Sequence, residues 1–372
     1  MSVKQQLAHR FLNILGWHTN RHIVVFESDD WGAIRMPSLE VLHKLKSKGV
    51  KISDVYGYDH IDTLASNDDL ELLMDLLSTV KDKNNNPAKI TLNTCVCNPD
   101  FNRIKEGNYQ TYYYEPFPET LKRYPHHDRS FVLWKEGIER KLFQPQFHGR
   151  EHINASMWMQ YLREGDISVR AACDEGVYSL DVNSRIDPRK KFLAAFNILY
   201  KDEYGFAINS IKEGLDIFEQ LFGFRPSSMI APSYTWDKEI EDAAFQEGVR
   251  FIQGGHMQIA SVYAKSQGIR SKRHYTGQKN KNGQVYLVRT CSFEPSQNPI
   301  ISADSCMKEI SMDFKMHKPA IVSCHRLNFI GDLNPSNRDG NLREFKRLLQ
   351  MIVAKYPDVE FMSSDDLGLL IC

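Results

Sequence analysis

The sequence has no excess of charge of either sign, since its 372 residues carry 47 Lys and Arg against 47 Asp and Glu. This balance excludes a bulk electrostatic attraction to nucleic acid or to an anionic membrane. Long apolar runs are also missing, and polar residues interrupt the segment 1–17, so neither a signal peptide nor a membrane span is predicted there. The seven cysteines are scattered and odd in number. They indicate reduced thiols and a cytoplasmic protein.

What the sequence does contain is a regular alternation of short apolar stretches and amphipathic segments. Helices are expected at 38–48, 66–80, 237–247 and 341–355. Strands are expected at 23–26, 89–96, 143–147, 167–172, 229–231, 250–253, 285–289, 320–323 and 359–362. The alternation predicts an α/β fold with a mainly parallel sheet covered by helices. We expect a single domain over 1–372, with loop excursions near 102–128 and 265–283.

Polar side chains repeatedly follow the C-terminal ends of the expected strands. In a (β/α) barrel these ends converge on one face, which carries the catalytic groups. The sequence therefore predicts a polar site at that face. The ionisable and amide residues placed in this way are Glu27, Asp29, Asp30, Asn98, Asp100, His148, Asp174, Glu175, Glu294 and His325.

Two pairs of residues at these strand ends have the chemistry of a metal site. His148 and His152 are four residues apart, and on a helical turn this spacing lets both rings reach one ion. Asp29 and Asp30 are adjacent carboxylates at the end of a buried strand, which is costly unless a cation or a proton separates their roles. A metal ligand beside a general base meets that requirement.

The same residues resemble the motifs of the polysaccharide deacetylase superfamily, also called the NodB-homology family. Its first motif, a strand ending in Asp-Asp, is matched by 26–32, and its second, His-x-x-x-His, by 148–152. The third motif corresponds to 229–236, and the last, a strand ending in His, to 320–325. The resemblance implies a distorted (β/α) barrel of seven or eight units that removes acetyl groups from amino sugars.

The resemblance also implies roles for five residues. Asp30, His148 and His152 would bind a divalent metal ion, with zinc expected, while Asp29 would be the general base and His325 the general acid. The expected partner is an N-acetylated sugar, and inside the cell a nucleotide-linked or lipid-linked intermediate fits best. The motifs specify neither the sugar nor the oligomeric state.

The third motif departs from the family pattern, because Ala231 stands where the family has an arginine that pairs with the base. Arg150 and Arg289, at neighbouring strand ends, are the two alternatives for that partner. Tyr234 and Trp236 are expected to form an apolar platform for a sugar ring. The full set of residues expected to contact substrate is Tyr234, Trp236, Arg150, Arg289, Asn98 and Glu294.

Two other interpretations are open from the sequence. Residues 148–152 also spell H-x-x-E-H, the inverted zinc-protease motif, which predicts a helix there with Glu151 as base and a distant ligand such as Glu219 or Glu241. That interpretation leaves Asp29 and His325 without a role. The second alternative is a catalytically degenerate, carbohydrate-binding barrel, for which the altered third motif is the main support.

Overall fold

The computed structural model describes residues 14–52, 58–179 and 192–372. The segment 1–13, which belongs to the N-terminal region predicted to hold no signal peptide or membrane span, lies outside these ranges. Within them, no helix has the length and apolar character needed to cross a bilayer. All seven cysteines fall in the described ranges and are free thiols, as the sequence predicts.

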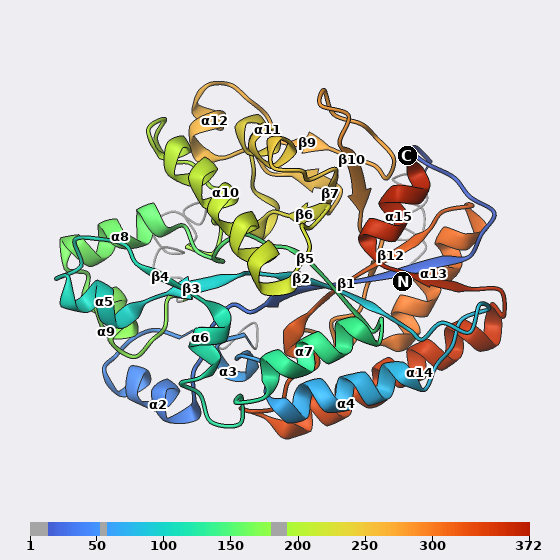
Figure 1. Ribbon diagram of the computed structural model, residues 1–372, viewed down its shortest axis with the longest axis horizontal. Helices are drawn as coiled ribbons and strands as arrows, with labels where there is room; N and C mark the ends of the chain where they lie inside the picture. Colours follow the sequence, from blue (N-terminus) through green and yellow to red (C-terminus); the bar gives the residue numbers. More distant parts are fainter. Residues whose placement is uncertain (1–13, 53–57, 180–191) are drawn as a thin grey trace.

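Nine strands form one sheet at the centre of the molecule (Figure 1). The order is β10–β7–β6–β5–β2–β1–β12–β11, with β13 also paired to β1. Every pairing in this sheet is parallel. The strands are β1 (Ile23–Trp31), β2 (Ile90–Thr94), β5 (Phe143–Phe147), β6 (Ser228–Ile230), β7 (Phe251–Gly254), β10 (Val285–Val288), β11 (Cys291–Ser292), β12 (Ala320–His325) and β13 (Glu360–Met362).

The two ends of this order are halves of one continuous segment, 285–292. Its first half, β10, pairs with β7, and its second half, β11, pairs with β12. At the change of partner, the Arg289 amide donates to the carbonyl oxygen of Gly254 at 2.8 Å, and the Thr290 amide donates to that of Ile321 at 2.9 Å. The sheet therefore returns on itself. The predicted distorted (β/α) barrel is confirmed, with its weakest junction at the single pair between β5 and β6.

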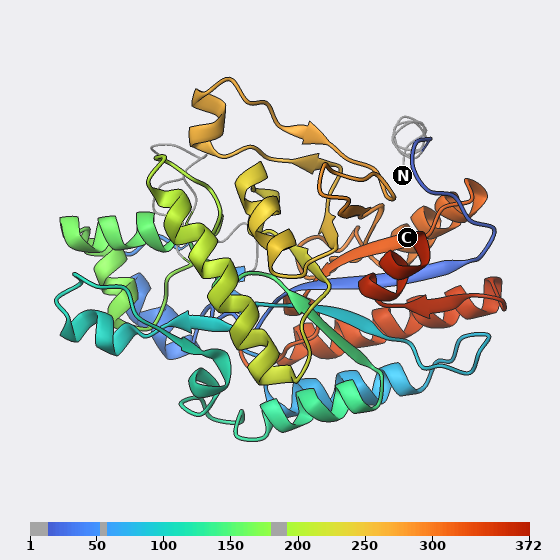
Figure 2. The ribbon, with the colours of Figure 1, turned by 45° about the horizontal axis from the view of Figure 1, so that its top comes forward.

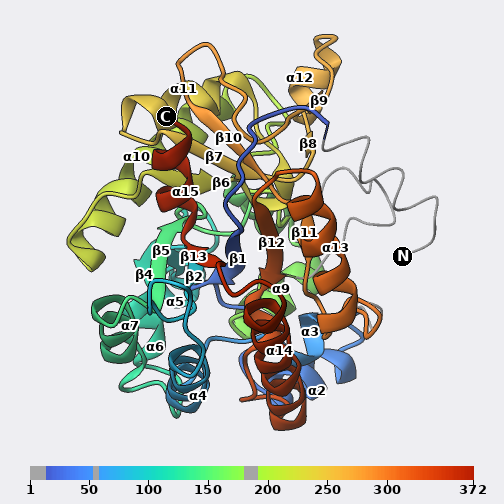
Figure 3. The same cartoon turned by 90° about the vertical axis from the view of Figure 1, so that its right-hand side faces the viewer.

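Helices surround the strands, as the side view in Figure 3 shows. Helices α4, α7 and α14 lie together along one side, and Figure 2 shows α10 beside α11 on the other. The helices are α2 (Leu39–Ser47), α3 (Tyr58–Ile61), α4 (Asn67–Ser78), α5 (Phe101–Glu106), α6 (Phe117–Leu121), α7 (Ser130–Glu139), α8 (Ala155–Glu164), α9 (Ile167–Asp174), α10 (Glu203–Phe222), α11 (Lys238–Gln246), α12 (Val262–Ser266), α13 (Ala303–Lys315), α14 (Pro335–Lys355) and α15 (Ser364–Ile371).

Two helix starts show why the sequence signals work. The side chains of Ser38 and Ser66 accept hydrogen bonds from backbone amides in the first turns of α2 and α4, which confirms both predicted caps. Helix α14 begins at Pro335, earlier than predicted from its apolar face, because Asn334 caps it and a proline suits the first turn.

The predicted strand at 167–172 is wrong, because this segment is helix α9. The side chain of Asp166 caps the helix by accepting a hydrogen bond from the amide of Val169 at 2.9 Å. Val169, Ala172 and Cys173 form its buried face, whereas Ile167 is 84% exposed. The apolar run thus follows the helical period, and its length alone did not distinguish the two structures.

The two predicted excursions contain short elements of their own. The segment 102–128 includes β4 (Tyr114–Pro116), which pairs with β3 (Cys97–Pro99), and the helix α6. The segment 265–283 includes β9 (Lys272–Arg273), which pairs with β8 (Met257–Gln258). The single-domain organisation stays a prediction.

Candidate active site

Asp29 and Asp30 both reach the polar end of the barrel because β1 is irregular there. The register between β1 and β2 shifts between Ser28 and Trp31, and Asp30 has a φ of 72°, in the left-handed region. In a regular strand, consecutive side chains point to opposite faces, and a bulge re-aims them. The irregularity therefore explains how adjacent carboxylates serve one site with different partners.

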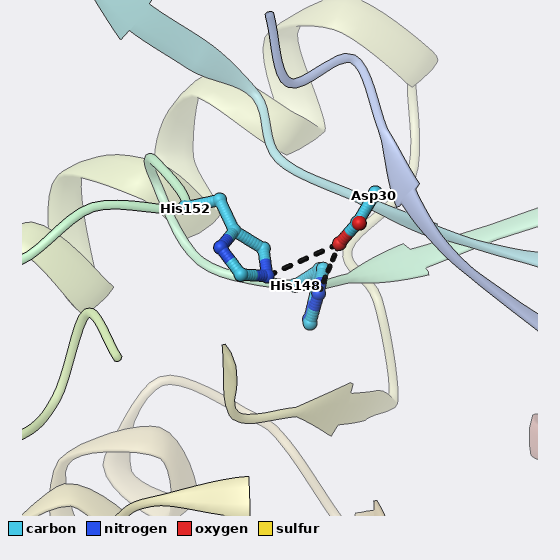
Figure 4. A group of neighbouring side chains, drawn as sticks. All are labelled: Asp30, His148 and His152. Carbon is cyan, nitrogen blue, oxygen red and sulfur yellow. Dashed lines mark ion pairs between the residues drawn. The ribbon is translucent and has the colours of Figure 1, made fainter. Parts of the chain in front are cut away.

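Asp30, His148 and His152 form a buried cluster (Figure 4). Oδ1 of Asp30 lies 3.1 Å from Nε2 of His152 and 3.4 Å from Nε2 of His148. The candidate ligand atoms of the three residues all lie within 4.8 Å of one another. One cation can therefore contact all three side chains.

The hydrogen bonds of His148 fit a cation at this position. Its Nδ1 lies 2.9 Å from the carbonyl oxygen of Ile230, which can only accept, so Nδ1 carries a proton and Nε2 is the nitrogen left to bind an ion. This buried nitrogen has no hydrogen-bond partner and faces an anionic oxygen of Asp30. Such an arrangement of electron-rich atoms favours a metal ion between them, and a carbonyl that orients a ligating histidine is common around metals.

His152 is also in the form that binds metals. Burial lowers the pKa of His152 to about 4, against the opposing charge of Asp30, so the ring is neutral near pH 7. Two imidazoles and one carboxylate are a donor set that zinc accepts while keeping further positions open. The residues present therefore fit the ion that the motifs imply.

Both histidines lie in the loop between β5 and α8, so the helical turn predicted for 148–152 is wrong. Gly149, with a φ of 105°, turns the chain directly after His148. The inverted zinc-protease interpretation needs a helix and a free carboxylate on Glu151. Residues 148–152 form a loop instead, and Glu151 accepts a hydrogen bond from Nε of Arg150 at 2.7 Å, so the structure does not support that alternative.

Arg289 is the arginine that pairs with the predicted base. Its Nη1 and Nη2 donate to Oδ2 and Oδ1 of Asp29 at 2.7 and 2.5 Å, and Asn93 Nδ2 donates to Oδ1 at 2.8 Å. Burial alone would raise the pKa of Asp29, but the charge and hydrogen bonds of Arg289 outweigh it and lower this pKa to about 2. Of the two alternatives for the third-motif arginine, Arg289 thus occupies the position beside the base.

Glu27 holds Arg289 from the opposite edge of the guanidinium. Nε of Arg289 donates to Oε2 of Glu27 at 2.7 Å, and Ser364 Oγ donates to Oε1 at 2.8 Å. Glu27 and Asp29 are two residues apart in one strand and so point to the same face. Sequence reasoning places Glu27 after the first strand but gives it no role, although its spacing from Asp29 was the signal for a shared partner.

His325, the last residue of β12, is the register partner of Asp29 on the neighbouring strand. Its Nε2 lies 3.9 Å from Oδ2 of Asp29, and its Nδ1 hydrogen-bonds to Oε1 of Glu294. Burial disfavours the imidazolium, but the charge and hydrogen bond of Glu294, with the charges of Asp29 and Asp30, raise the pKa of His325 to about 9. The ring is therefore a cationic acid at neutral pH.

Arg150 points away from Asp29. Its guanidinium forms ion pairs with Glu151 and Glu213 and lies 4.0 Å from the ring centroid of Tyr114. Its charge is already paired with two carboxylates, so the expectation that Arg150 contacts substrate is not supported. Its place in the structure is to anchor the loop that carries the two histidines.

Two further expectations about substrate contacts are corrected by burial. Trp236 is 2% exposed and its Nε1 donates to Glu241 at 2.9 Å, so its ring belongs to the core and cannot form a sugar platform. Asn98 is fully buried, where Nδ2 donates to the Gly32 carbonyl at 3.0 Å and Oδ1 accepts from the Ile34 amide at 2.8 Å. Both side chains stabilise the barrel rather than meet a ligand.

The other two expected contacts lie at the site. Tyr234 is half-buried, and its hydroxyl lies 3.1 Å from Nη1 of Arg289. Glu294 touches His325 and also accepts a hydrogen bond from Asn328 Nδ2 at 2.8 Å. Tyr234 is thus partly exposed beside Arg289, whereas Glu294 is buried against His325.

No family model matches the chain, and no curated protein matches it. Solved structures that resemble it include a protein assigned as a polysaccharide deacetylase, from Mycobacterium smegmatis, at 10% identity and a TM-score of 0.45, covering 96% of this chain and 92% of that one. A CE4 family pseudoenzyme from Bacillus anthracis matches at 10% identity and a TM-score of 0.38, over 94% and 66% of the two chains.

A 4-alpha-glucanotransferase from Thermococcus litoralis also resembles the chain, at 10% identity and a TM-score of 0.46. The match covers 94% of this chain but only 40% of the glucanotransferase. The solved structures that resemble the chain thus include a deacetylase, a pseudoenzyme and a glucanotransferase. At TM-scores below 0.5 the likeness itself supports no conclusion about activity, and the roles of the residues rest on their own geometry.

Proposed function

We propose that this protein is a metal-dependent hydrolase that removes the N-acetyl group from an amino sugar or a sugar-containing intermediate. The observation that carries the proposal is the position of Asp30 Oδ1, 3.1 and 3.4 Å from two imidazole nitrogens, beside a second carboxylate and a cationic histidine. Asp30, His148 and His152 would hold the ion, with zinc the expected metal. When bound, a divalent ion supplies Lewis acidity and lowers the pKa of water.

Asp29 is the proposed general base. Its carboxylate is ionised across the physiological range because Arg289 keeps its pKa low, and the paired guanidinium fixes its two oxygens. A base with so low a pKa takes a proton only from water that is already strongly acidified, which agrees with a site built around a cation. Asp29 would accept that proton as the water oxygen bonds to the acetyl carbon.

His325 is the proposed general acid. Its raised pKa keeps it protonated at neutral pH, and Nδ1 is engaged by Glu294, which leaves the proton on Nε2 for transfer. The C–N bond breaks as the amine nitrogen takes this proton. The products are acetate and the free amino sugar, and Asp29 and His325 then exchange their protons with solvent.

The presence of Arg289 beside Asp29 weakens the alternative of a degenerate binding barrel. That alternative rests mainly on Ala231 in the third motif, and another strand supplies the missing guanidinium. The proposal is tested by acetate release from a panel of N-acetylated amino sugars, using protein loaded with zinc. Stoichiometric zinc with no acetate from any sugar would favour the binding barrel.

Loss of one proposed ligand is expected to remove the metal. Asp30→Ala and His152→Ala should reduce bound zinc from about one ion per chain to a small fraction after dialysis, since a three-residue site that loses a ligand holds its ion far more weakly. Metal content by plasma mass spectrometry measures this. The matched control is His126→Ala, an exposed histidine that should leave zinc unchanged. Full zinc in both ligand variants would exclude this site.

The pH profile is expected to report on Glu294. In the wild type, activity should fall as the pH rises toward about 9, because His325 must be protonated to act as the acid. A bound cation repels the imidazolium and so does not raise the pKa of His325 further. Glu294→Gln removes the largest opposing charge while burial persists, so the alkaline limb of kcat should move to lower pH. If the alkaline limb of the variant stays at the pH of the wild type, that limb does not report the titration of His325.

A further inference from the structure

The two oxygens of Asp30 have different partners. Oδ1 faces both imidazole rings, as Figure 4 shows, whereas Oδ2 accepts a hydrogen bond from Nη2 of Arg35 at 2.9 Å. Arg35 is only 4% exposed, so solvent does not compete for this pair. With Oδ2 engaged, only Oδ1 of Asp30 is left for an ion.

Arg35 also forms a buried ion pair with a second acid, without a hydrogen bond between the two side chains. Its Nε lies 3.5 Å from Oδ2 of Asp62, whose other oxygen accepts from Nε and Nη2 of Arg326 at 3.1 and 2.9 Å. Asp62 and Arg326 are both fully buried. Arg326 Nη1 also donates to the carbonyl oxygen of Ala33 at 2.6 Å, just beyond β1. We call Asp30, Arg35, Asp62 and Arg326 the charge chain.

The charge chain joins the two halves of the site. It starts at Asp30 in β1 and ends at Arg326, which directly follows His325 and opens the short helix η2 (Arg326–Asn328). Positive and negative members alternate, so that each buried charge has an opposite neighbour, which buried charges require. Removing Arg35 leaves Oδ2 of Asp30 without its partner and frees Asp30 to turn, whereas removing Asp62 leaves Arg35 paired with Asp30 alone.

We propose that Arg35 is a positioning residue that restricts Asp30 to one-oxygen coordination of the metal ion, and that Asp62 and Arg326 fix Arg35 relative to the turn carrying His325. The inference rests on the proposed function, since it concerns the same metal site. It assigns Arg35, Asp62 and Arg326 a role that none of the four sequence motifs contains.

The test uses the full chain loaded with Co²⁺, whose visible absorption reports coordination number. Arg35→Met should weaken Co²⁺ affinity by about 10- to 100-fold, as loss of an outer-shell partner typically does, and should reduce the visible band because a freed Asp30 can bind through both oxygens. Arg35→Lys keeps the charge and should restore part of the affinity. Asp62→Asn changes no side-chain volume, and should weaken affinity in the same direction. Asp62→Asn therefore tests the same role if Arg35→Met does not fold.

The control is Arg225→Met, which removes an arginine with three acidic partners remote from the site. It should leave both the Co²⁺ affinity and the spectrum as in the wild type. Unchanged or tighter binding in Arg35→Met and Asp62→Asn would overturn the positioning role while leaving the metal site intact. Absence of Co²⁺ binding by the wild type would overturn the proposed function and this inference together.

Discussion

Asp29→Asn is expected to lower kcat for deacetylation by about 10²- to 10⁴-fold, the usual effect of removing a positioned general base. The amide has the shape of the carboxylate but cannot take a proton from water. Zinc content should stay at the wild-type level, because Asp30 and the two histidines are untouched. Acetate release under saturating substrate, together with metal analysis of the same sample, measures both quantities.

Asp29→Asn also removes one charged partner of Arg289, so the effect on the free energy of unfolding needs a separate control variant. Breaking a buried ion pair by removing one member costs about 3–5 kcal/mol of unfolding free energy. Glu27→Gln removes the charge of the carboxylate whose oxygen lies 2.7 Å from Nε of Arg289, and it leaves Asp29 in place. It should be destabilised to a similar degree but lose far less of kcat. A kcat for Asp29→Asn within about tenfold of the wild type would reject Asp29 as the base.

His325→Gln is expected to separate two kinds of substrate. Hydrolysis of an N-acetyl amine should fall by about 10²- to 10⁴-fold, because the departing nitrogen needs the proton that His325 supplies. Hydrolysis of an aryl acetate ester should fall at most about tenfold, since a phenolate leaves without protonation. The two rates measured on one zinc-loaded preparation give the contrast directly.

Asp29→Asn provides the matched comparison, because loss of the base should slow both substrates alike. If His325→Gln slows the amide and the ester equally, the histidine does not act as an acid on the leaving group. A positioning or electrostatic role would then replace the one proposed.

Much of the barrel follows from local signals in the sequence. The capping serines of α2 and α4 and the apolar runs of the parallel strands identify these elements, because burial on both faces makes such strands continuously hydrophobic. The predicted strand 23–26 ends too early, since Glu27 and Asp29 interrupt the apolar run of β1 while remaining buried. Their burial depends on Arg289, far away in the chain, and no local pattern reports it.

The dependence on contacts between distant parts of the chain also explains which parts of the site could be predicted. The resemblance to the deacetylase motifs predicts the cluster of Asp30, His148 and His152, which the structure brings together, and it is the source of the roles proposed for Asp29 and His325. The motifs left Arg150 and Arg289 as equal alternatives, because both are single arginines after a strand. Only the change of pairing at Arg289, from β7 to β12, shows which one enters the barrel. Arg35 and Asp62 were missed because a lone charged residue usually indicates an exposed surface.

The joining of β7 to β12 by a single segment also has a consequence for synthesis on the ribosome. Asp29 and Arg289 are 260 positions apart, so two carboxylates are made long before the cation that neutralises them. Until that late segment emerges, the nascent chain cannot bury Glu27 and Asp29 without a large electrostatic penalty. Closure of the barrel interior around these carboxylates is therefore deferred until the segment 285–292 has been synthesised, and the earlier part of the chain must wait for it.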